Sequence, residues 1–490
     1  SSKAKEATTN TDGKSKLDEA LVKMVASDLQ PFSIVEDKGF KQYLKTMDPS
    51  YTLLSRKTLS QYLLPKIYAK LGAEVFQLTT DCWTSVATTS YMSVTCHYVQ
   101  DFEMTSHFLD CFVLTDRHTS VHLASELKRV ANDWDVSDKV VACVTDNASN
   151  IVAALKEHLH WDHIPCFAHV LNLIVRAALK EVRSIIIKIK SVVEYFHRST
   201  VASDKLKATQ QQMGQEQLRL KQDVPTRWNS TYYMLKRFIK VKDPVISTLA
   251  LISASLLTLS TEEWGIAQET VDIIKPFEEF TVITALRTVE LLNSVCRFVT
   301  ASKVILMARG LQRIVARHQR SPSIHEPVQK LVDRLMADMQ KRFSKVEQIE
   351  KLADATCLDP RFKKQAFVNH KHSTQAMFWE DFDERVANAR ASTSSDFATS
   401  STSTAVMMEM RAYLAEPLLS CTSDPLTWWR VCSPVFKTPS EVMKTRLCIV
   451  ATSVPSERIF SKTGQIITDR RNRLSPSKVR ELMFLNDNLP

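Results

Sequence analysis

The order of strand-like and helix-like segments between residues 75 and 184 constrains the fold of this chain most strongly. The first part of this region contains three segments that alternate polar and apolar residues or are rich in β-branched and aromatic side chains, as strands are. A turn is expected to begin at Gln100–Asp101. The three predicted strands, which would form a meander, are 75–80, 91–99 and 106–115.

The remainder of the region alternates helix and strand. An amphipathic helix is expected at 119–134, and the apolar run VVACVT at 140–145 is typical of a strand buried on both faces. A helix over Ile151–His158, a short strand at Ile164–Cys166 and a helix from Ala168 follow. The resulting order, β-β-β-α-β-α-β-α, is that of an RNase H-like domain.

Beyond about Ser184 the apolar spacing becomes helical for more than two hundred residues. Ser260 and Glu263 form a capping-box pattern ahead of one such helix. The clearest apolar face follows Pro327 and contains Val328, Leu331, Val332, Leu335, Met336 and Met339.

The expected fold is α/β plus all-α, an RNase H-like fold interrupted by a large helical insertion domain and preceded by an N-terminal helical region. Ten of the thirteen residues at 392–404 are Ser or Thr, which predicts a mobile loop. The expected divisions are a disordered leader (1–16), an N-terminal helical region (17–74), the first part of the RNase H-like domain (75–184), the helical insertion (185–430) and the last part of the RNase H-like domain (431–490).

Charge and composition narrow the classes of function. The 64 Lys and Arg outnumber the 54 Asp and Glu, so the net charge of +10 permits a polyanionic partner. No segment approaches the roughly 20 apolar residues that cross a bilayer. The ten cysteines include no CxxC pair, which favours free thiols in an intracellular protein. Only seven glycines are present and neither glycine-rich nucleotide motif occurs, so a P-loop or Rossmann domain is disfavoured.

Two aspartates follow the predicted strands at positions suited to metal chemistry. Asp81 follows the first strand in TTDCWTS, and Asp146 follows the central apolar strand in VTDNASN, 65 residues later. In an RNase H order these two strands are neighbours. Phosphodiester cleavage by two metal ions requires carboxylates that hold the ions roughly 4 Å apart.

Six segments together resemble, in family order, the motifs of the hAT superfamily of DNA transposases, close to its BED-finger branch. They span nearly the whole chain after residue 75. The segments are TTDCWTS (79–85), VTDNASN (144–150), CFAHVLNLIV (166–175), TRWNST (226–231), LDPRFK (358–363) and ATSVPSERIFSKTGQIITDRRNRLSP (451–476).

The resemblance implies that Glu457 completes an Asp-Asp-Glu site with Asp81 and Asp146, although it lies 311 residues after Asp146. It also implies a nuclear cut-and-paste transposase that cleaves and transfers DNA strands with two Mg²⁺ ions, or Mn²⁺, through a hairpin intermediate. The expected partners are double-stranded DNA, both transposon ends and target, and further copies of the chain. No membrane or small-molecule substrate is expected.

Four further residues acquire DNA-binding roles from the resemblance. Arg227 and Trp228 match a pair beside the active site, where the indole can stack on a displaced base; the alternative for Trp228 is a place in the core. Cys166 and His169 match a Cys-x-x-His element that handles DNA near the scissile phosphate. With His163 their spacing also admits zinc, but a fourth ligand is lacking.

A basic run follows Glu457 and contains one acid, Asp469. Its position favours phosphate contact, with a solvated helix face as the alternative. Lys236, Arg237, Lys240 and Lys242 form a second candidate group, and the apolar stretch 482–489 resembles the family's dimerisation segment. The residues of the basic run are Arg458, Lys462, Arg470, Arg471, Arg473, Lys478 and Arg480.

Two features depart from the family pattern. No Cys-Cys-His-His finger precedes Leu17, so the chain is expected to be a fragment, and Pro439 and Val450 interrupt the expected sequence before SVPSER. The main alternative is a domesticated relative, a dimeric nuclear DNA-binding regulator that no longer cuts. An RNase H-type nuclease for RNA–DNA hybrids is disfavoured by the long insertion and the Arg-Trp motif.

Overall fold

The structure is a computed structural model of the 490-residue chain. It describes residues 14, 17–22, 24–25, 32–55, 58, 77–84, 89–134, 136–224, 227–252, 258–286, 299–320, 324–367 and 399–457.

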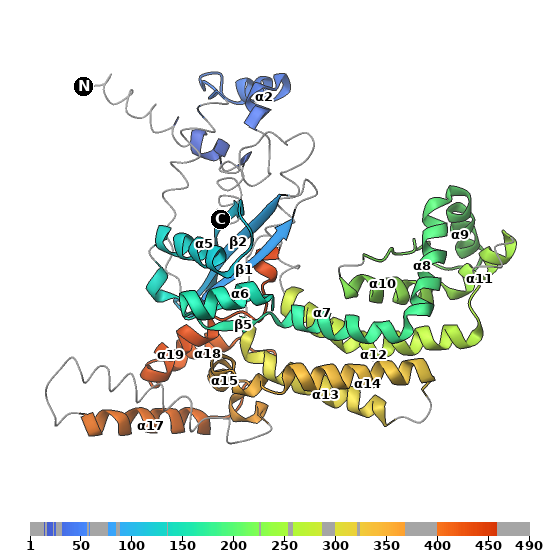
Figure 1. The fold of residues 1–490 in the computed structure, drawn as a ribbon. Coiled ribbons are helices and arrows are strands. Elements are labelled where there is room, and N and C mark those ends of the chain that lie inside the picture. Colours follow the sequence, from blue (N-terminus) through green and yellow to red (C-terminus); the bar gives the residue numbers. More distant parts are fainter. Residues whose placement is uncertain are drawn as a thin grey trace.

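A mixed five-stranded sheet lies at the centre of the fold (Figure 1). Its strands run in the order β3-β2-β1-β4-β5. The first three are antiparallel neighbours, as the predicted meander requires, whereas β4 and β5 lie parallel to β1. The strands are β1 (Gln77–Thr84), β2 (Ser90–Gln100), β3 (Glu103–Val113), β4 (Ala142–Thr145) and β5 (His163–Pro165).

The turn of the meander begins at Gln100, as the sequence predicts. Gln100 pairs with Glu103, and Asp101 and Phe102 between them have φ values of 50° and 60°. Left-handed conformations at both central residues match the right-handed twist of a two-residue hairpin. Such conformations are unfavourable for a bulky side chain, so a Phe at this position could not be anticipated from turn preferences.

One face of the sheet is apolar and packs against helices α5 (Ser120–Asp133) and α6 (Ser149–Ala153). Leu78 of β1 and Met92 and Val94 of β2 point into this layer, together with Leu127 of α5. The helix expected at Ile151–His158 begins two residues earlier as α6 and continues as a wider π-helical turn, η4 (Ala154–Leu159).

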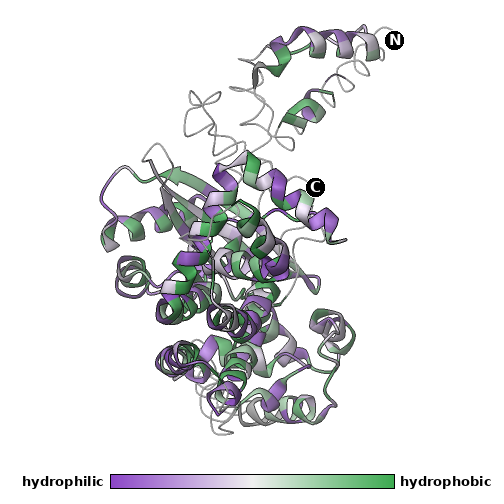
Figure 2. Cartoon of the chain, turned by 90° about the vertical axis from the view of Figure 1, so that its right-hand side faces the viewer, coloured by the Kyte–Doolittle hydropathy of each residue, from purple (hydrophilic) through white to green (hydrophobic). Residues whose placement is uncertain are grey.

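The other face of β4 and β5 packs against α7 (Phe167–Ala178), which leads away from the sheet into a long helical layer (Figure 1). Most of its helices show one hydrophilic and one hydrophobic side (Figure 2). They comprise η5 (Leu179–Val182), α8 (Arg183–Arg198), α9 (Thr200–Gln212), α10 (Trp228–Lys240), α11 (Lys242–Leu251), α12 (Thr261–Leu286), η7 (Ala301–Lys303), α13 (Val304–Gln319), α14 (Glu326–Phe343), η8 (Val346–Gln348) and α15 (Glu350–Cys357).

Two of these helices confirm local sequence predictions. The Glu263 backbone N–H donates to Ser260 Oγ at 3.2 Å and the Ser260 N–H donates to Glu263 Oε2 at 2.7 Å, which completes the capping box at the start of α12. In α14 five of the six predicted apolar positions are buried, and Met336 is half-buried.

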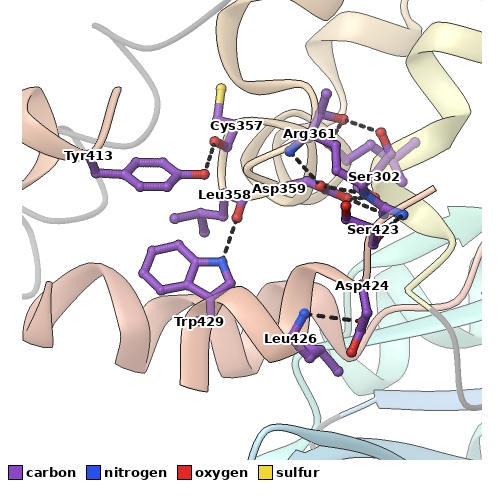
Figure 3. Close-up of polar contacts among 12 residues, drawn as sticks. Ser302, Cys357, Leu358, Asp359, Arg361, Tyr413, Ser423, Asp424, Leu426 and Trp429 are labelled. Carbon is purple, nitrogen blue, oxygen red and sulfur yellow. Dashed lines mark hydrogen bonds and ion pairs between the residues drawn. The ribbon is translucent and has the colours of Figure 1, made fainter. Parts of the chain in front are cut away.

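The LDPRFK motif has a structural role at the junction between the helical layer and the last helices of the chain (Figure 3). The Arg361 guanidinium donates to both oxygens of Asp359, at 2.8 and 2.5 Å, and both residues are buried. Ser302 Oγ donates to the same carboxylate at 2.7 Å. The Trp429 indole N–H donates to the Leu358 carbonyl at 2.9 Å, so the motif binds η7 and α18 (Pro425–Cys432) to α15.

The segment before these last helices corrects one prediction. The Ser/Thr-rich stretch 392–404 was expected to be a loop, but its second part, from Thr399, forms the first turns of α17 (Thr399–Ala415). The apolar, helix-favouring sequence AVMMEMRAYLA that follows allows these residues to extend an existing helix despite their modest propensity. The remaining elements are η1 (Phe32–Glu36), α2 (Lys38–Met47), η9 (Lys363–Ala366), α18 (Pro425–Cys432) and α19 (Lys437–Leu447).

Across the part of the chain that the structure describes, no helix combines the length and the apolar character that a membrane span needs.

Candidate active site

Asp81 lies near the middle of the sheet, within β1. The sequence places it just after a strand, but β1 continues to Thr84 because residues 81–84 remain paired with β2. Its half-buried carboxyl group has its pKa raised to about 8, first by burial and then by the negative charges of Glu457 and Asp146.

Asp146 follows the last residue of β4. Since β1 and β4 are parallel neighbours, their carboxyl ends lie at the same edge of the sheet, and this brings Asp146 to Asp81. The Asp146 side chain accepts the backbone N–H of Ala148 at 3.2 Å, a local turn that directs the chain into α6. Its charge acts on both Asp81 and Glu457.

Glu457 is the last residue that the structure describes, and it is helical together with residues 454–456 after α19. The segment before it is attached to distant parts of the chain: the Phe167 N–H donates to the Ala451 carbonyl at 2.9 Å and the Ala451 N–H donates to Thr300 Oγ1 at 2.8 Å. Burial raises the pKa of Glu457, Arg227 and His169 oppose this rise, and Asp146 adds to it. The third predicted carboxylate therefore lies in the same electrostatic environment as the first two.

The three carboxylates share this environment without meeting at one point. Among the described residues, no three His, Cys, Asp or Glu side chains are close enough together to hold a single metal ion. This also holds for His163, Cys166 and His169, whose spacing admitted zinc. As a donor set, three half-buried carboxylates that repel one another provide the hard oxygen ligands that Mg²⁺ prefers, so their chemistry fits a divalent cation.

Two basic side chains lie beside Glu457. Arg227 is exposed at the N-cap of α10, and His169 is half-buried in the first turn of α7. Both act on the pKa of the glutamate. Their side chains can therefore meet an anionic group that approaches the carboxylates.

Trp228 is buried in this structure. Only 3% of its surface is exposed, its ring lies 6.3 Å from that of Tyr232, and its backbone N–H donates to Asn172 Oδ1 at 3.3 Å. These contacts favour the core alternative. Stacking on a displaced base would require the indole to be uncovered first.

Cys166 is fully buried as well, and it precedes α7. Its sulfur accepts the backbone N–H of Ser453 at 3.3 Å, so the contact that the structure shows is with the segment that carries Glu457. A direct contact with DNA would need this sulfur to be exposed. Burial also raises the pKa of the thiol to about 11, which keeps it uncharged at neutral pH.

The predicted basic groups are placed only in part. Arg458, Lys462, Arg470, Arg471, Arg473, Lys478 and Arg480 lie outside the described residues, as does the apolar stretch 482–489. The second group contacts other parts of the protein: Arg237 donates to the Arg219 carbonyl at 3.0 Å, Lys240 pairs with Glu216, and Lys236 and Lys242 lie over the rings of Tyr232 and Trp264.

Three family models match the chain. The ZBED1 RNase-like domain matches residues 79–166, the ZBED1 RNase-like helical domain matches 164–273, and the hAT family C-terminal dimerisation region matches 409–489. The chain therefore belongs to the hAT superfamily. Within it, the two ZBED1 models place the chain in the BED-type zinc-finger branch.

Curated relatives agree with this assignment. The human zinc finger BED domain-containing protein 4 is 26% identical over 97% of this chain and 44% of its own length. The putative AC transposase of Zea mays is 26% identical over 93% of this chain and 63% of its own length. The human zinc finger BED domain-containing protein 6 is 26% identical over 56% of this chain and 30% of its own length. The chain thus spans less than two thirds of the length of each of these three relatives.

Proposed function

We propose that this chain is the catalytic core of a cut-and-paste DNA transposase whose carboxylates Asp81, Asp146 and Glu457 carry strand cleavage and strand transfer. The observation that supports this most directly is their mutual charge interaction. The three half-buried acids come from distant parts of the chain. Asp81 lies in a central strand, Asp146 follows the parallel neighbour of that strand, and Glu457 comes 311 residues after Asp146. Such a concentration of negative charge is costly unless a cation neutralises it.

In this proposal the three carboxylates would hold Mg²⁺ or Mn²⁺, and they would draw closer together than in the present structure when they do so. Two such ions supply activation of the attacking oxygen and stabilisation of the leaving oxygen. Asp81 is fixed by its pairing with Ser93 of β2, and two residues earlier β1 is also paired with β4, at Thr79. Arg227 and His169 would contact the phosphate groups on either side of the scissile bond, which favours DNA as the substrate.

The remaining parts of the proposal follow from family membership. The helices between residues 185 and 430 would form an insertion into an RNase H-like fold, 17–74 a helical N-terminal region, and 431–490 the last part of the catalytic domain. Cleavage would proceed through a DNA hairpin, in the nucleus, on transposon ends and target DNA.

Self-association is the second element of the proposed function. The matched dimerisation region includes α18, and Val431 and Val435, on this helix and in the turn after it, are 73% and 68% exposed. Exposed apolar side chains this close together in the chain favour a protein contact. A second copy of the chain is the proposed partner.

The experiment that tests the proposed function is a cleavage assay on labelled duplex DNA with Mn²⁺ or Mg²⁺. The longer protein with its BED finger should be tested beside this chain. Wild type should nick and form hairpins, and Asp146→Asn should lower the rate by at least about 10³-fold while DNA binding persists, since a ligand charge is lost with little change in volume. Cleavage that survives in Asp146→Asn would point to other catalytic residues.

A domesticated regulator is the second candidate, because the matched relatives include proteins named for their BED zinc finger as well as a putative transposase. Such a protein would bind DNA as a dimer and leave it intact. Specific DNA binding without any cleavage, with the finger restored and either metal present, would favour it.

A further inference from the structure

The second face of strands β1 and β2 carries polar side chains, yet it is buried. Thr79 pairs with Thr95, and Asp81 pairs with Ser93. Thr79, Ser93 and Thr95 are at most 3% exposed. A buried hydroxyl group without a hydrogen-bond partner destabilises the fold. The partners of these groups therefore show what covers the face.

The buried hydroxyls form a continuous hydrogen-bonded chain across three strands. Ser106 Oγ of β3 lies 2.7 Å from His97 Nδ1 of β2, and His97 Nε2 lies 3.1 Å from Thr95 Oγ1. Thr95 bonds to Thr79 of β1. Thr79 Oγ1 lies 2.7 Å from Ser456 Oγ. We call these five residues, Ser106, His97, Thr95, Thr79 and Ser456, the hydroxyl chain.

The imidazole of His97, between Ser106 and Thr95 in the hydroxyl chain, is uncharged. Burial, together with the nearby His107, lowers the pKa of His97 to about 3. A neutral imidazole has one N–H donor and one acceptor nitrogen, so it can continue a row of hydroxyl groups in one direction or the other. Both orientations of the row satisfy both ring nitrogens.

A second attachment fixes the end of the hydroxyl chain. Ser93 Oγ donates to the Ser456 carbonyl at 3.2 Å, so Ser456 is bound through its side chain to β1 and through its main chain to β2. The next residue is Glu457. The strand partner of Ser93 is Asp81. The hydrogen bond between Ser93 and Ser456 therefore joins the strand partner of Asp81 to the residue before Glu457.

We infer that the hydroxyl chain, with Ser93, sets the position of Glu457 relative to Asp81, and that its members are positioning residues for the candidate active site. Aliphatic side chains of the same shape would fill the face without polar atoms and would exclude water equally well. A satisfied polar network instead specifies one arrangement of the groups that it connects. This matters here because the 451–457 segment arrives from a distant part of the sequence.

The importance of this arrangement for catalysis rests on the proposed function, but the attachment itself can be tested without catalysis. The test compares Thr79→Val and Ser456→Ala with two controls. Thr79→Ser keeps the hydroxyl group. Thr80→Val removes an equally buried hydroxyl from the next residue, on the opposite face of β1, where it donates to the Ser93 carbonyl at 2.8 Å.

Hydrogen exchange of a peptide covering residues 449–457 is the primary measurement. Exchange should become roughly tenfold faster in Thr79→Val and Ser456→Ala, because each substitution removes one or two of the hydrogen bonds that hold the segment. It should change less than about twofold in Thr79→Ser and Thr80→Val. Equal acceleration in Thr79→Val and Thr80→Val, or none in Thr79→Val, would overturn the inference.

Single-turnover cleavage at saturating DNA is the second measurement. Thr79→Val should lower the rate about 10²-fold with unchanged DNA affinity, since small displacements of a catalytic group have effects of that size, and Thr79→Ser should restore it. A wild-type rate in Thr79→Val, where wild type cleaves, would contradict the positioning role. If wild type cleaves no DNA, the proposed function fails, while the exchange result still decides whether the hydroxyl chain holds the segment.

Discussion

At the scale of single residues, Trp228 shows how burial decides between two uses of one side chain. The tryptophan begins α10, while Arg227 before it is exposed and acts on Glu457. The pair is therefore divided between the core and the surface. A role for the indole in stability accounts for its burial and for its contact with the ring of Tyr232.

Replacing Trp228 by Ala should lower the free energy of unfolding by about 3–5 kcal/mol, because truncation of a buried aromatic leaves a cavity. Trp228→Phe should recover a large part of that loss. Chemical denaturation of the variants measures both. A loss below about 1 kcal/mol in Trp228→Ala, combined with normal nicking and a selective failure to form hairpins, would instead support stacking on a displaced base.

At the scale of elements, the junction around Asp359 and Arg361 joins helices that are far apart in sequence. Arg361 also donates to the Ser423 carbonyl at 3.3 Å (Figure 3), so one guanidinium connects α15 with the loop before α18. A buried ion pair contributes little over an apolar pair, but removal of one partner leaves the other charge buried.

Arg361→Ala should therefore destabilise the protein by about 3–5 kcal/mol through the unpaired Asp359 carboxylate. The matched control is Arg430→Ala, which breaks the ion pair between Arg430 and Glu103. In that pair the arginine side chain is 50% exposed. The control should cost less than about 1 kcal/mol. Thermal and denaturant unfolding of both variants test this, and similar losses in the two would show that burial of the Asp359 pair is not what matters.

The elements also show what the sequence could predict. Periodicity located the five strands and α14 because their apolar residues repeat over several positions. Asp81 and Asp146 could be brought together from the rule for neighbouring parallel strands. Glu457 could not, since no local rule determines how a chain returns after 311 residues; only the motif resemblance indicated it.

The hydroxyl chain was missed for a related reason. Ser93, Thr95 and His97 alternate with Met92, Val94 and Cys96, and such alternation normally indicates a strand with one face in solvent. The polar face is buried because residues 451–457 cover part of it. The row of polar residues Ser93, Thr95 and His97, on the strand that pairs with the strand of Asp81, is the sequence signal that could have indicated this network.

At the scale of the whole molecule, the net charge of +10 should make DNA binding depend on salt concentration. Basic side chains on phosphates release condensed counterions, so affinity should fall steeply as salt is added. The same charge distributed over solvated helices would contribute much less to the slope of log affinity against log salt concentration. The basic run after Glu457 and exposed arginines elsewhere can be compared directly.

Arg470, Arg471 and Arg473 changed together to Ala should weaken binding to unrelated duplexes alike and reduce the slope of log affinity against log salt by up to about 3. The control removes the same charge from α13 and its C-cap residue, as Arg313, Arg317 and Arg320 to Ala. These three arginines are exposed and lie at helical spacing. Fluorescence anisotropy over a range of salt measures both. Equal effects in the two triple variants would mean that binding responds to net charge alone.

The central claim is that Asp81, Asp146 and Glu457 form one metal site from three distant parts of the chain. Calorimetric titration with Mn²⁺ tests it most directly, on wild type, Asp81→Asn, Asp146→Asn and Glu457→Gln. The control is Glu441→Gln, whose side chain is 73% exposed on α19. Each of the three site variants should bind Mn²⁺ at least about tenfold more weakly, a difference of about 1.4 kcal/mol, and the control should match wild type. Wild-type affinity in any of the three site variants would contradict a shared site.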